Sequence, residues 1–166
     1  LFLILIVFTN YQKNFFLKIV NNSIEEFSKN FQYQYINLNV SGLVKVEYSF
    51  LENKLKKYLN SSIFLLPLDE ITMEIRENNW IKSVNLSTNY RDTLFVSLEE
   101  YKPLGIYSFN DRKFYFDNKG KIIDEVKIDL SDYKNFIVFY GKSSNLKAKI
   151  IIDLMNSLNF QKKFNI

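Results

Sequence analysis

Among the adjacent carboxylate pairs in this sequence, Asp69-Glu70 and Glu99-Glu100 are the candidates for acid–base chemistry. Such pairs transfer protons or cleave glycosidic bonds only where both carboxylates face one cleft. Neighbouring residues on a strand point to opposite faces, so the second pair diverges, and the first pair has the position of a helix start. The chain contains no histidine and no cysteine, which excludes histidine-based triads, cysteine nucleophiles and thiolate or imidazole metal sites. We therefore expect a protein that is not an enzyme and that uses no cofactor and no metal ion.

The composition favours a folded and mildly basic protein. Hydrophobic residues make up 47% of the 166 residues, which is enough apolar material for a core. Lysine and arginine together number 22 against 18 acidic residues, which gives a net charge of +4. Only three of the basic residues are arginines, the residue type on which base and phosphate recognition depends. We expect a solvated lysine surface and no nucleic-acid partner.

The first eight residues, Leu1 to Phe8, are all apolar. A membrane-spanning helix needs roughly 20 such residues. An amphipathic helical pattern follows over 14–31, where apolar residues recur every three or four positions. We therefore expect residues 1–13 to be the outer end of a transmembrane helix and residues 14–32 to be a juxtamembrane amphipathic helix. The alternative is that the first eight residues form a buried strand or helical turn of a soluble domain.

Residues 33–102 follow the order strand, helix, helix, strand, strand. The first strand places Ile36, Leu38 and Val40 on one face, and an apolar stripe predicts a helix over 47–59. Two helices packed on one face of a small sheet would bury this one-sided pattern. The predicted fold class is therefore α+β.

The second helix of this segment is short. We expect Asp69 to cap its N-terminus, and Ile71, Met73 and Ile75 to face inward. Two alternating strands joined by a turn-prone loop complete the segment over 80–100. Trp80 is the only tryptophan, and at a helix-to-strand junction we expect it to anchor the core.

Residues 103–166 favour a second, β-rich part of the same chain. Short strand patterns occur within 103–123 and over 136–139, and residues 161–166 have the pattern of an approach to a further strand. Between them we expect a helix over 145–158. Its spacing predicts contact with the sheet through Leu146, Ile150, Leu154 and Leu158.

Five short motifs stand in order along the middle of the chain. They are Val40-Ser41-Gly42, Ile63-Phe64-Leu65 with Leu68-Asp69, Trp80-Ile81-Lys82-x-Val84, Asp92-Thr93-Leu94 and Glu100-x-x-Pro103. In this order and spacing they resemble the POTRA domain of the FtsQ family of bacterial division proteins, also called DivIB. A turn with Asp117 and Gly120 resembles the element that opens the β domain of the family. The chain departs from the family pattern at Asn79 and Arg91, where proline is usual, and at Gly105, where alanine is common.

The resemblance implies a POTRA domain over 33–102 with the order β-α-α-β-β, followed by the N-terminal part of a mixed β domain over 103–166. It gives a structural role to the motif residues Val40, Gly42, Trp80, Asp92, Leu94, Glu100, Pro103, Asp117 and Gly120. It also implies a fragment truncated at both ends, because the β domain of the family continues for several more strands. The distal part of that domain carries the main contact to FtsB and FtsL in the family.

The resemblance further implies a non-enzymatic scaffold of the bacterial division machinery. Such a protein crosses the inner membrane once, has most of its chain in the periplasm, gathers at midcell and links early and late division proteins. Its partners would be the membrane, through the N-terminal helix, and other division proteins of the FtsB, FtsL, FtsK, FtsW and FtsI type. The alternative is a POTRA module of an outer-membrane assembly or secretion protein that binds β-strand clients.

POTRA domains as a class bind extended partners along an exposed sheet edge, where unpaired backbone groups accept an incoming strand. By resemblance, the strand over 81–88 forms that edge. The candidate partner-binding residues are polar, as an exposed strand requires, namely Lys82, Ser83, Asn85, Ser87 and Thr88. The alternative is a solvated edge that binds nothing.

Overall fold

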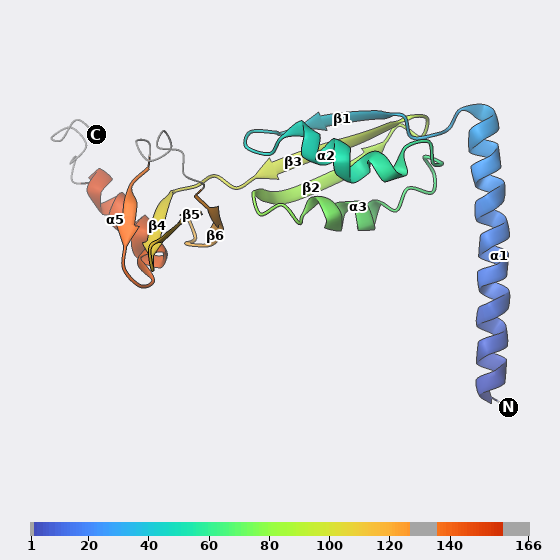
Figure 1. Ribbon diagram of the computed structural model, residues 1–166, viewed down its shortest axis with the longest axis horizontal. Helices are drawn as coiled ribbons and strands as arrows, with labels where there is room; N and C mark the ends of the chain where they lie inside the picture. Colours follow the sequence, from blue (N-terminus) through green and yellow to red (C-terminus); the bar gives the residue numbers. More distant parts are fainter. Residues whose placement is uncertain (1, 127–135, 158–166) are drawn as a thin grey trace. The chain divides into compact units, whose positions relative to one another are not determined.

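The computed structural model describes residues 2–126 and 136–157, with side chains from residue 12 onward (Figure 1). The chain divides into two compact units, with the boundary between Glu99 and Glu100. Each unit has its own sheet and its own buried cluster. The mixed α+β class predicted from the sequence is confirmed.

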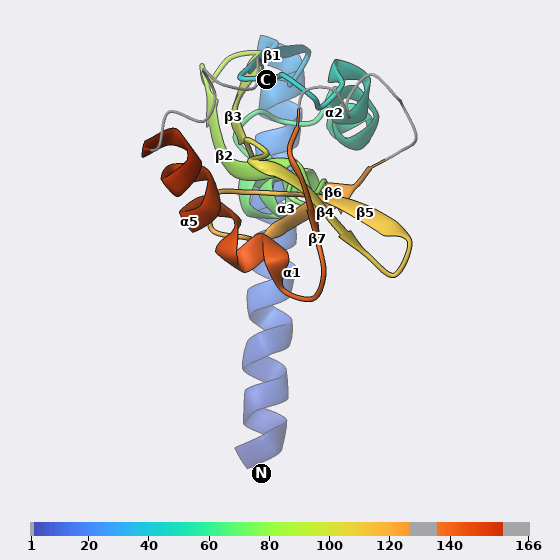
Figure 2. The ribbon, with the colours of Figure 1, turned by 90° about the vertical axis from the view of Figure 1, so that its left-hand side faces the viewer.

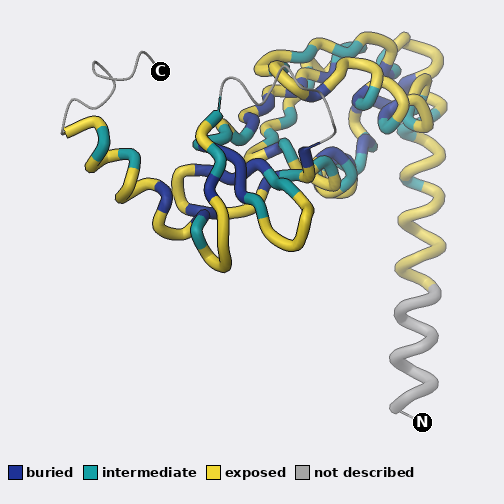
Figure 3. Tube along the Cα trace, turned by 60° about the vertical axis from the view of Figure 1, so that its left-hand side comes forward, coloured by how far each residue is buried: buried dark blue, intermediate teal, exposed yellow. Residues whose placement is uncertain are grey.

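The N-terminal element is one unbroken helix, α1 (Phe2–Phe31), which runs through the boundary expected near residue 13. Its apolar stripe is largely uncovered in the described part, since Phe16, Phe27 and Phe31 are all exposed (Figure 3). In the part of the chain that the structure describes, no helix has the length and apolar character needed to cross a membrane.

The first unit continues with a three-stranded sheet and two helices. Its elements are β1 (Asn37–Ser41), α2 (Tyr48–Leu55), the 3-10 helix η1 (Lys56–Tyr58), α3 (Leu68–Ile75), β2 (Ile81–Thr88) and β3 (Thr93–Glu100). This is the predicted order β-α-α-β-β. The strands lie in the order β1-β3-β2, and β1 runs parallel to β3. The last strand is therefore central, and β1 and β2 form the two edges of the sheet.

The core of this unit lies between the sheet and the two helices. Leu94 of β3 is fully buried together with Leu51 of α2 and with Ile71 and Ile75 of α3. Along β3, buried and exposed residues alternate, so the helices cover one face of the sheet only. Trp80 is half-buried and packs against this cluster, as expected.

Helix α3 differs from the sequence expectation at both its cap and its inward face. The helix begins at Leu68, two residues earlier than expected, so Pro67 takes the cap position and Asp69 lies inside the first turn. Met73 is 67% exposed, because a helix of about two turns presents only one narrow stripe to the sheet. The expectations for Asp69 as the cap and Met73 as a core residue are therefore wrong.

Strand β1 is shorter than the strand predicted to begin at residue 33. Tyr35 is buried, but Ile36 is 54% exposed because regular pairing starts only at Asn37. The expectation that Ile36 shares the buried face with the two apolar residues of β1 is wrong. This exposed isoleucine lies directly before an edge strand.

In its described residues, the second unit contains a four-stranded sheet and one helix. Its elements are β4 (Gly105–Phe109), β5 (Arg112–Phe116), β6 (Ile122–Glu125), β7 (Val138–Tyr140) and α5 (Ser144–Ser157). The strands lie in the order β6-β5-β4-β7, and only β7 is parallel to its neighbour (Figure 2). The rings of Phe116 and Phe139 meet edge to face at 5.7 Å in its core.

Helix α5 packs on its sheet through a different face from the one predicted. The exposed stripe consists of Leu146, Ile150 and Leu154, which are 63%, 72% and 58% exposed. Ala148 is fully buried instead, because its small side chain lets the helix approach the sheet closely. The Asn145 side chain donates a hydrogen bond to the Gly120 carbonyl at 2.7 Å and fixes the rotation of the helix. Leu158 and the strand expected over 161–166 lie outside the described residues.

Candidate partner-binding edge

Strand β2 lies at an edge of the first sheet, as the resemblance to POTRA domains implies (Figure 1). Its half-buried residues Val84 and Leu86 pack against the core. The candidate side chains Lys82, Ser83, Asn85 and Ser87 are exposed, and Thr88 is partly exposed. The structure therefore brings all five candidate residues to one open strand.

The backbone hydrogen bonds near the hairpin indicate which groups of β2 remain at the open edge. The Asn89 N–H donates to the Thr93 carbonyl at 3.3 Å, so the chain at Asn89 faces β3. Because N–H groups alternate in direction along a strand, the N–H of Ser87 also faces β3, and those of Leu86 and Thr88 face outward. Outward groups of this kind are a template for an added strand.

Two of the candidate side chains hold the hairpin together. The Lys82 ammonium donates to Glu99 at 2.6 Å, and the Ser83 hydroxyl donates to the other oxygen of Glu99 at 3.1 Å. All three side chains are exposed, so these contacts add little to the free energy of unfolding. Their effect is to hold the start of β2 against the central strand.

The hairpin loop is ordered by two side chains. The Asn89 side-chain oxygen accepts hydrogen bonds from the N–H groups of Arg91, Asp92 and Thr93 at 2.9 to 3.0 Å. The Asp92 carboxylate accepts from the Asn89 amide at 2.9 Å and from the Thr93 hydroxyl at 2.7 Å, and these bonds lower the pKa of Asp92. The Asp92 carbonyl accepts from the Asn37 N–H at 2.9 Å. The motif residue Asp92 thus joins the edge hairpin to β1.

Gly42 ends β1 in a conformation that requires glycine. Its φ is +86°, and a Cβ atom there would stand 1.9 Å from the Leu98 carbonyl oxygen of β3. The close approach of the two backbones explains why a glycine follows Val40 in the motif.

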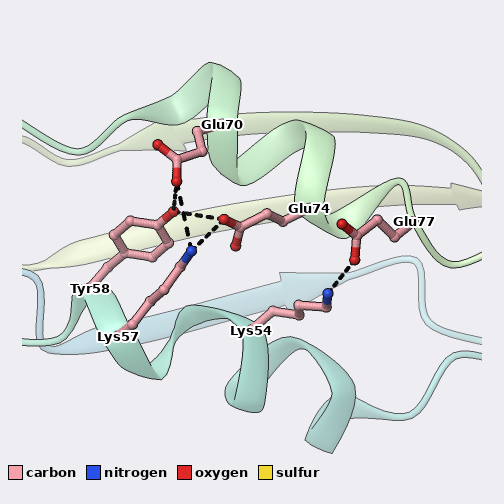
Figure 4. Close-up of polar contacts among 6 residues, drawn as sticks. All are labelled: Lys54, Lys57, Tyr58, Glu70, Glu74 and Glu77. Atoms are coloured by element: carbon pink, nitrogen blue, oxygen red, sulfur yellow. Dashed lines mark hydrogen bonds and ion pairs between the residues drawn. The ribbon is translucent and has the colours of Figure 1, made fainter.

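The two helices are joined by a polar group on the surface (Figure 4). It consists of Lys54, Lys57, Tyr58, Glu70, Glu74 and Glu77. The Tyr58 hydroxyl donates to Glu70 and to Glu74, at 3.1 Å in each case. The hydrogen bond from Lys57 lowers the pKa of Glu74, and burial raises the pKa of Tyr58. These bonds tie η1 to α3.

The last turns of α1 contact the connector between η1 and α3. The hydroxyls of Ser28 and Ser62 are hydrogen-bonded at 2.7 Å, and both residues are fully buried. The Glu25 carboxylate accepts a hydrogen bond from the Ser62 N–H at 3.0 Å. The ring of Phe27 stacks on that of Tyr33 at 5.8 Å. Residues of α1 and of the connector thus share a buried polar contact that sequence patterns alone did not indicate.

In the second unit, the motif residues Asp117 and Gly120 form one turn. The Asp117 carboxylate accepts hydrogen bonds from the N–H groups of Lys119 and Lys121, both at 2.9 Å. Gly120 has a φ of +80°, and a Cβ atom there would stand 2.9 Å from the Asn145 carbonyl oxygen. Asp117 and Gly120 thus stabilise the turn between β5 and β6.

The two candidate carboxylate pairs, Asp69-Glu70 and Glu99-Glu100, do not converge in the described residues. Glu99 is exposed and Glu100 is buried, so the two side chains lie on opposite faces of β3. Glu70 is engaged by the Tyr58 hydroxyl. Across residues 12–126 and 136–157, no three histidine, cysteine or acidic side chains are grouped as metal ligands.

The three-stranded sheet with two helices on one face and an open edge defines a POTRA-type binding domain. A family model described as "POTRA domain, FtsQ-type" matches residues 36–101. These residues contain all the strands and helices of the first unit after α1.

Curated relatives extend the match beyond this domain. "Cell division protein FtsQ" of Rickettsia felis is 26% identical over 155 residues, which cover 93% of this chain and 57% of the relative. The proteins of the same name from Rickettsia bellii and Rickettsia prowazekii are 27% and 28% identical, and cover 70% and 71% of this chain. The chain spans between 43% and 57% of the length of these relatives. The POTRA match and these relatives show that the chain is similar to FtsQ cell division proteins.

The sequence did not indicate that β1 is an edge as well. Strand patterns reveal which residues face the core, but they do not reveal the order of strands in a sheet. The parallel pairing of β1 with β3 leaves the other side of β1 open along Asn37–Ser41.

Proposed function

We propose that this chain acts as a non-enzymatic scaffold of bacterial cell division. It is anchored in the inner membrane through the segment around residues 1–13, with the bulk of the chain in the periplasm. It recruits other single-pass division proteins of the FtsB, FtsL and FtsK type for septum formation. The observation that carries the proposal is the FtsQ-type POTRA domain with β2 as an open edge.

The proposed mechanism is strand addition at β2. An extended segment of a partner pairs with the outward backbone groups of Leu86 and Thr88, and these main-chain hydrogen bonds supply affinity. The exposed side chains of Asn85 and Ser87 flank the added strand and contribute to the choice of partner. Polar edge side chains also protect the free protein from uncontrolled pairing with other sheets.

The test is a fluorescent fusion of the full-length protein imaged in dividing cells of its own bacterium. We expect a band at midcell that is lost with Thr88→Pro, because proline removes an outward N–H from the edge. Thr88→Val keeps this N–H and the shape of the side chain, so the band remains. Fluorescence of Trp80 during urea unfolding verifies that both variants are folded.

Two results would contradict the proposal. An even envelope signal, in cells that divide normally without the protein, excludes a role in division. A midcell band that persists with Thr88→Pro excludes strand addition at β2 as the means of recruitment.

A further inference from the structure

The outer side of β1 faces a hollow beside helix α2. The hollow has a volume of about 180 Å³ and is lined by Tyr35 and Leu38 together with exposed apolar residues. These are Ile36, Tyr48 and Leu59, which are 54%, 42% and 43% exposed. Exposed apolar side chains therefore line one pocket next to a sheet edge.

Backbone groups at this edge are directed toward the hollow. The Asn37 N–H donates to the Asp92 carbonyl of the hairpin at 2.9 Å, so Asn37 faces β3. By alternation, the backbone groups of Leu38 and Val40 face outward. The Tyr48 hydroxyl donates to the Leu38 carbonyl at 3.5 Å, which confirms the outward direction of that group. An added strand could pair with Leu38 and Val40.

The size of the hollow suits one large side chain. An apolar cavity of about 150 Å³ binds benzene, so 180 Å³ accommodates a phenylalanine or leucine side chain. A strand paired with the outer side of β1 places the side chain opposite Leu38 on the face covered by α2. Burial raises the pKa of Tyr35 to about 12, with smaller contributions from Tyr48 and Glu52, so the phenol beneath this side chain stays uncharged.

Charges beside the hollow specify the direction of an occupant. Helix α2 runs antiparallel to β1, because Tyr48 contacts Leu38 while the Asn60 N–H donates to the Tyr35 carbonyl at 2.9 Å. Of the two charged residues in the lining, Lys56 therefore lies nearer the start of β1 than Glu52 does. A bound segment would complement these charges with an acidic residue near Lys56 and a basic residue near Glu52.

We propose that the β1 edge is a second docking site, separate from β2. Its occupant is an extended segment of a partner protein that pairs antiparallel with β1. The segment inserts a phenylalanine or leucine between Tyr48 and Leu59, with a basic residue two positions before it and an acidic residue two positions after it. The site does not depend on the proposed role of β2.

The test is a fluorescence anisotropy titration of the full chain with a labelled synthetic peptide. The peptide contains the run Lys-Thr-Phe-Thr-Glu between threonines. We expect saturable binding that weakens about 10-fold or more with Leu59→Glu, because an acidic side chain replaces the apolar rim. A peptide with serine in place of phenylalanine loses a similar factor, and a peptide with its two charges exchanged binds more weakly than the original.

Met73→Glu is the matched control. Met73 is an exposed apolar residue on α3 that does not line the hollow, so this variant binds the peptide as the original chain does. Thr88→Pro also leaves peptide binding unchanged, which separates this site from the β2 edge. Trp80 fluorescence during unfolding verifies that Leu59→Glu is folded.

Three outcomes would overturn the proposal. The first is the absence of saturable binding at millimolar peptide, and the second is equal binding by the Leu59→Glu variant. The third is a dimer of the chain that the peptide does not dissociate and that Leu59→Glu converts to a monomer. In that case the occupant of the β1 edge is a second copy of the chain.

Discussion

At the scale of single residues, substitutions at Gly42 distinguish the destabilising effect of backbone strain from that of steric overlap. We expect Gly42→Ala to destabilise the first unit by roughly 3 kcal/mol or more, because the residue has a positive φ and its Cβ would meet the Leu98 carbonyl. The measurement is urea unfolding followed by Trp80 fluorescence. Because the only tryptophan lies in the first unit, this signal reports on that unit.

Gly42→Asn is the matched variant. Asparagine tolerates a positive φ better than alanine does, but it carries the same Cβ atom. If the close approach of the backbones dominates, both variants are destabilised by a similar amount. A clear recovery of stability with asparagine would show that the conformational strain matters more than the contact.

Asp92 makes the stability of the hairpin depend on pH. Hydrogen bonds from Asn89 and Thr93 lower its pKa, so the carboxylate form is favoured in the folded state. Its contribution is fully present above the ordinary aspartate pKa near 4, and is lost as the pH falls through the lower folded-state value. We expect Asp92→Asn to be less stable than the original chain at pH 6, with a difference that shrinks below about pH 4.

The check is a series of urea midpoints from Trp80 fluorescence between neutral pH and the acid limit of folding. The two proteins also share another carboxylate of the first unit with a lowered pKa, Glu74, so acid lowers the stability of that unit in both. Parallel curves with a constant gap would contradict the role of the Asp92 charge.

At the scale of elements, the contact between α1 and the connector includes a fully buried hydroxyl pair, Ser28 with Ser62. Ser28→Ala leaves Ser62 without this partner in a fully buried position, and we expect a loss of about 1–2 kcal/mol. Ser62→Ala costs a similar amount. The double variant loses less than the sum of the two, because the second change removes the unsatisfied hydroxyl. Additive losses in this double-mutant cycle would show that the two hydroxyls are not coupled.

Most elements could be predicted from the sequence because their apolar residues follow a clear period. The β-α-α-β-β order and the helix over Ser144–Ser157 were found this way. Which stripe of a helix packs inward was harder to predict. In α5, the face with the larger apolar residues is exposed. The face that packs on the sheet carries Ala148, whose small side chain allows close approach, and Asn145, which donates a hydrogen bond to the Gly120 carbonyl.

The candidate site was likewise predictable from the sequence only in part. The resemblance to POTRA domains and the polar character of the side chains indicated Lys82, Ser83, Asn85, Ser87 and Thr88 as edge residues. In the structure the first four are exposed and Thr88 is partly exposed. The engagement of Glu99 by two of them and the hollow at β1 depend on which strands and helices are neighbours. Those contacts join residues far apart in the sequence, so local pattern could not indicate them.

At the scale of the whole molecule, each unit has its own core, so the first unit should fold independently. We expect a fragment of residues 24–102 to unfold at the same urea concentration as the full chain by Trp80 fluorescence, because the buried cluster lies within it. A fragment of residues 33–102 lacks Ser28 and should be less stable by at least as much as Ser28→Ala. A large loss in the longer fragment would mean that the second unit supports the first.

The parallel pairing of β1 with β3 has a mechanical consequence. The chain enters this sheet at the start of β1 and leaves it at the end of β3, and the two strands are paired in register from Asn37 with Thr93 to Ser41 with Ser97. Tension applied between these two points pulls neighbouring strands along their length in opposite directions. All the hydrogen bonds between them then carry the load together in shear instead of opening one after another. The domain is thus built to resist stretching along the path of its own chain, while β2 carries no load and remains open at its edge.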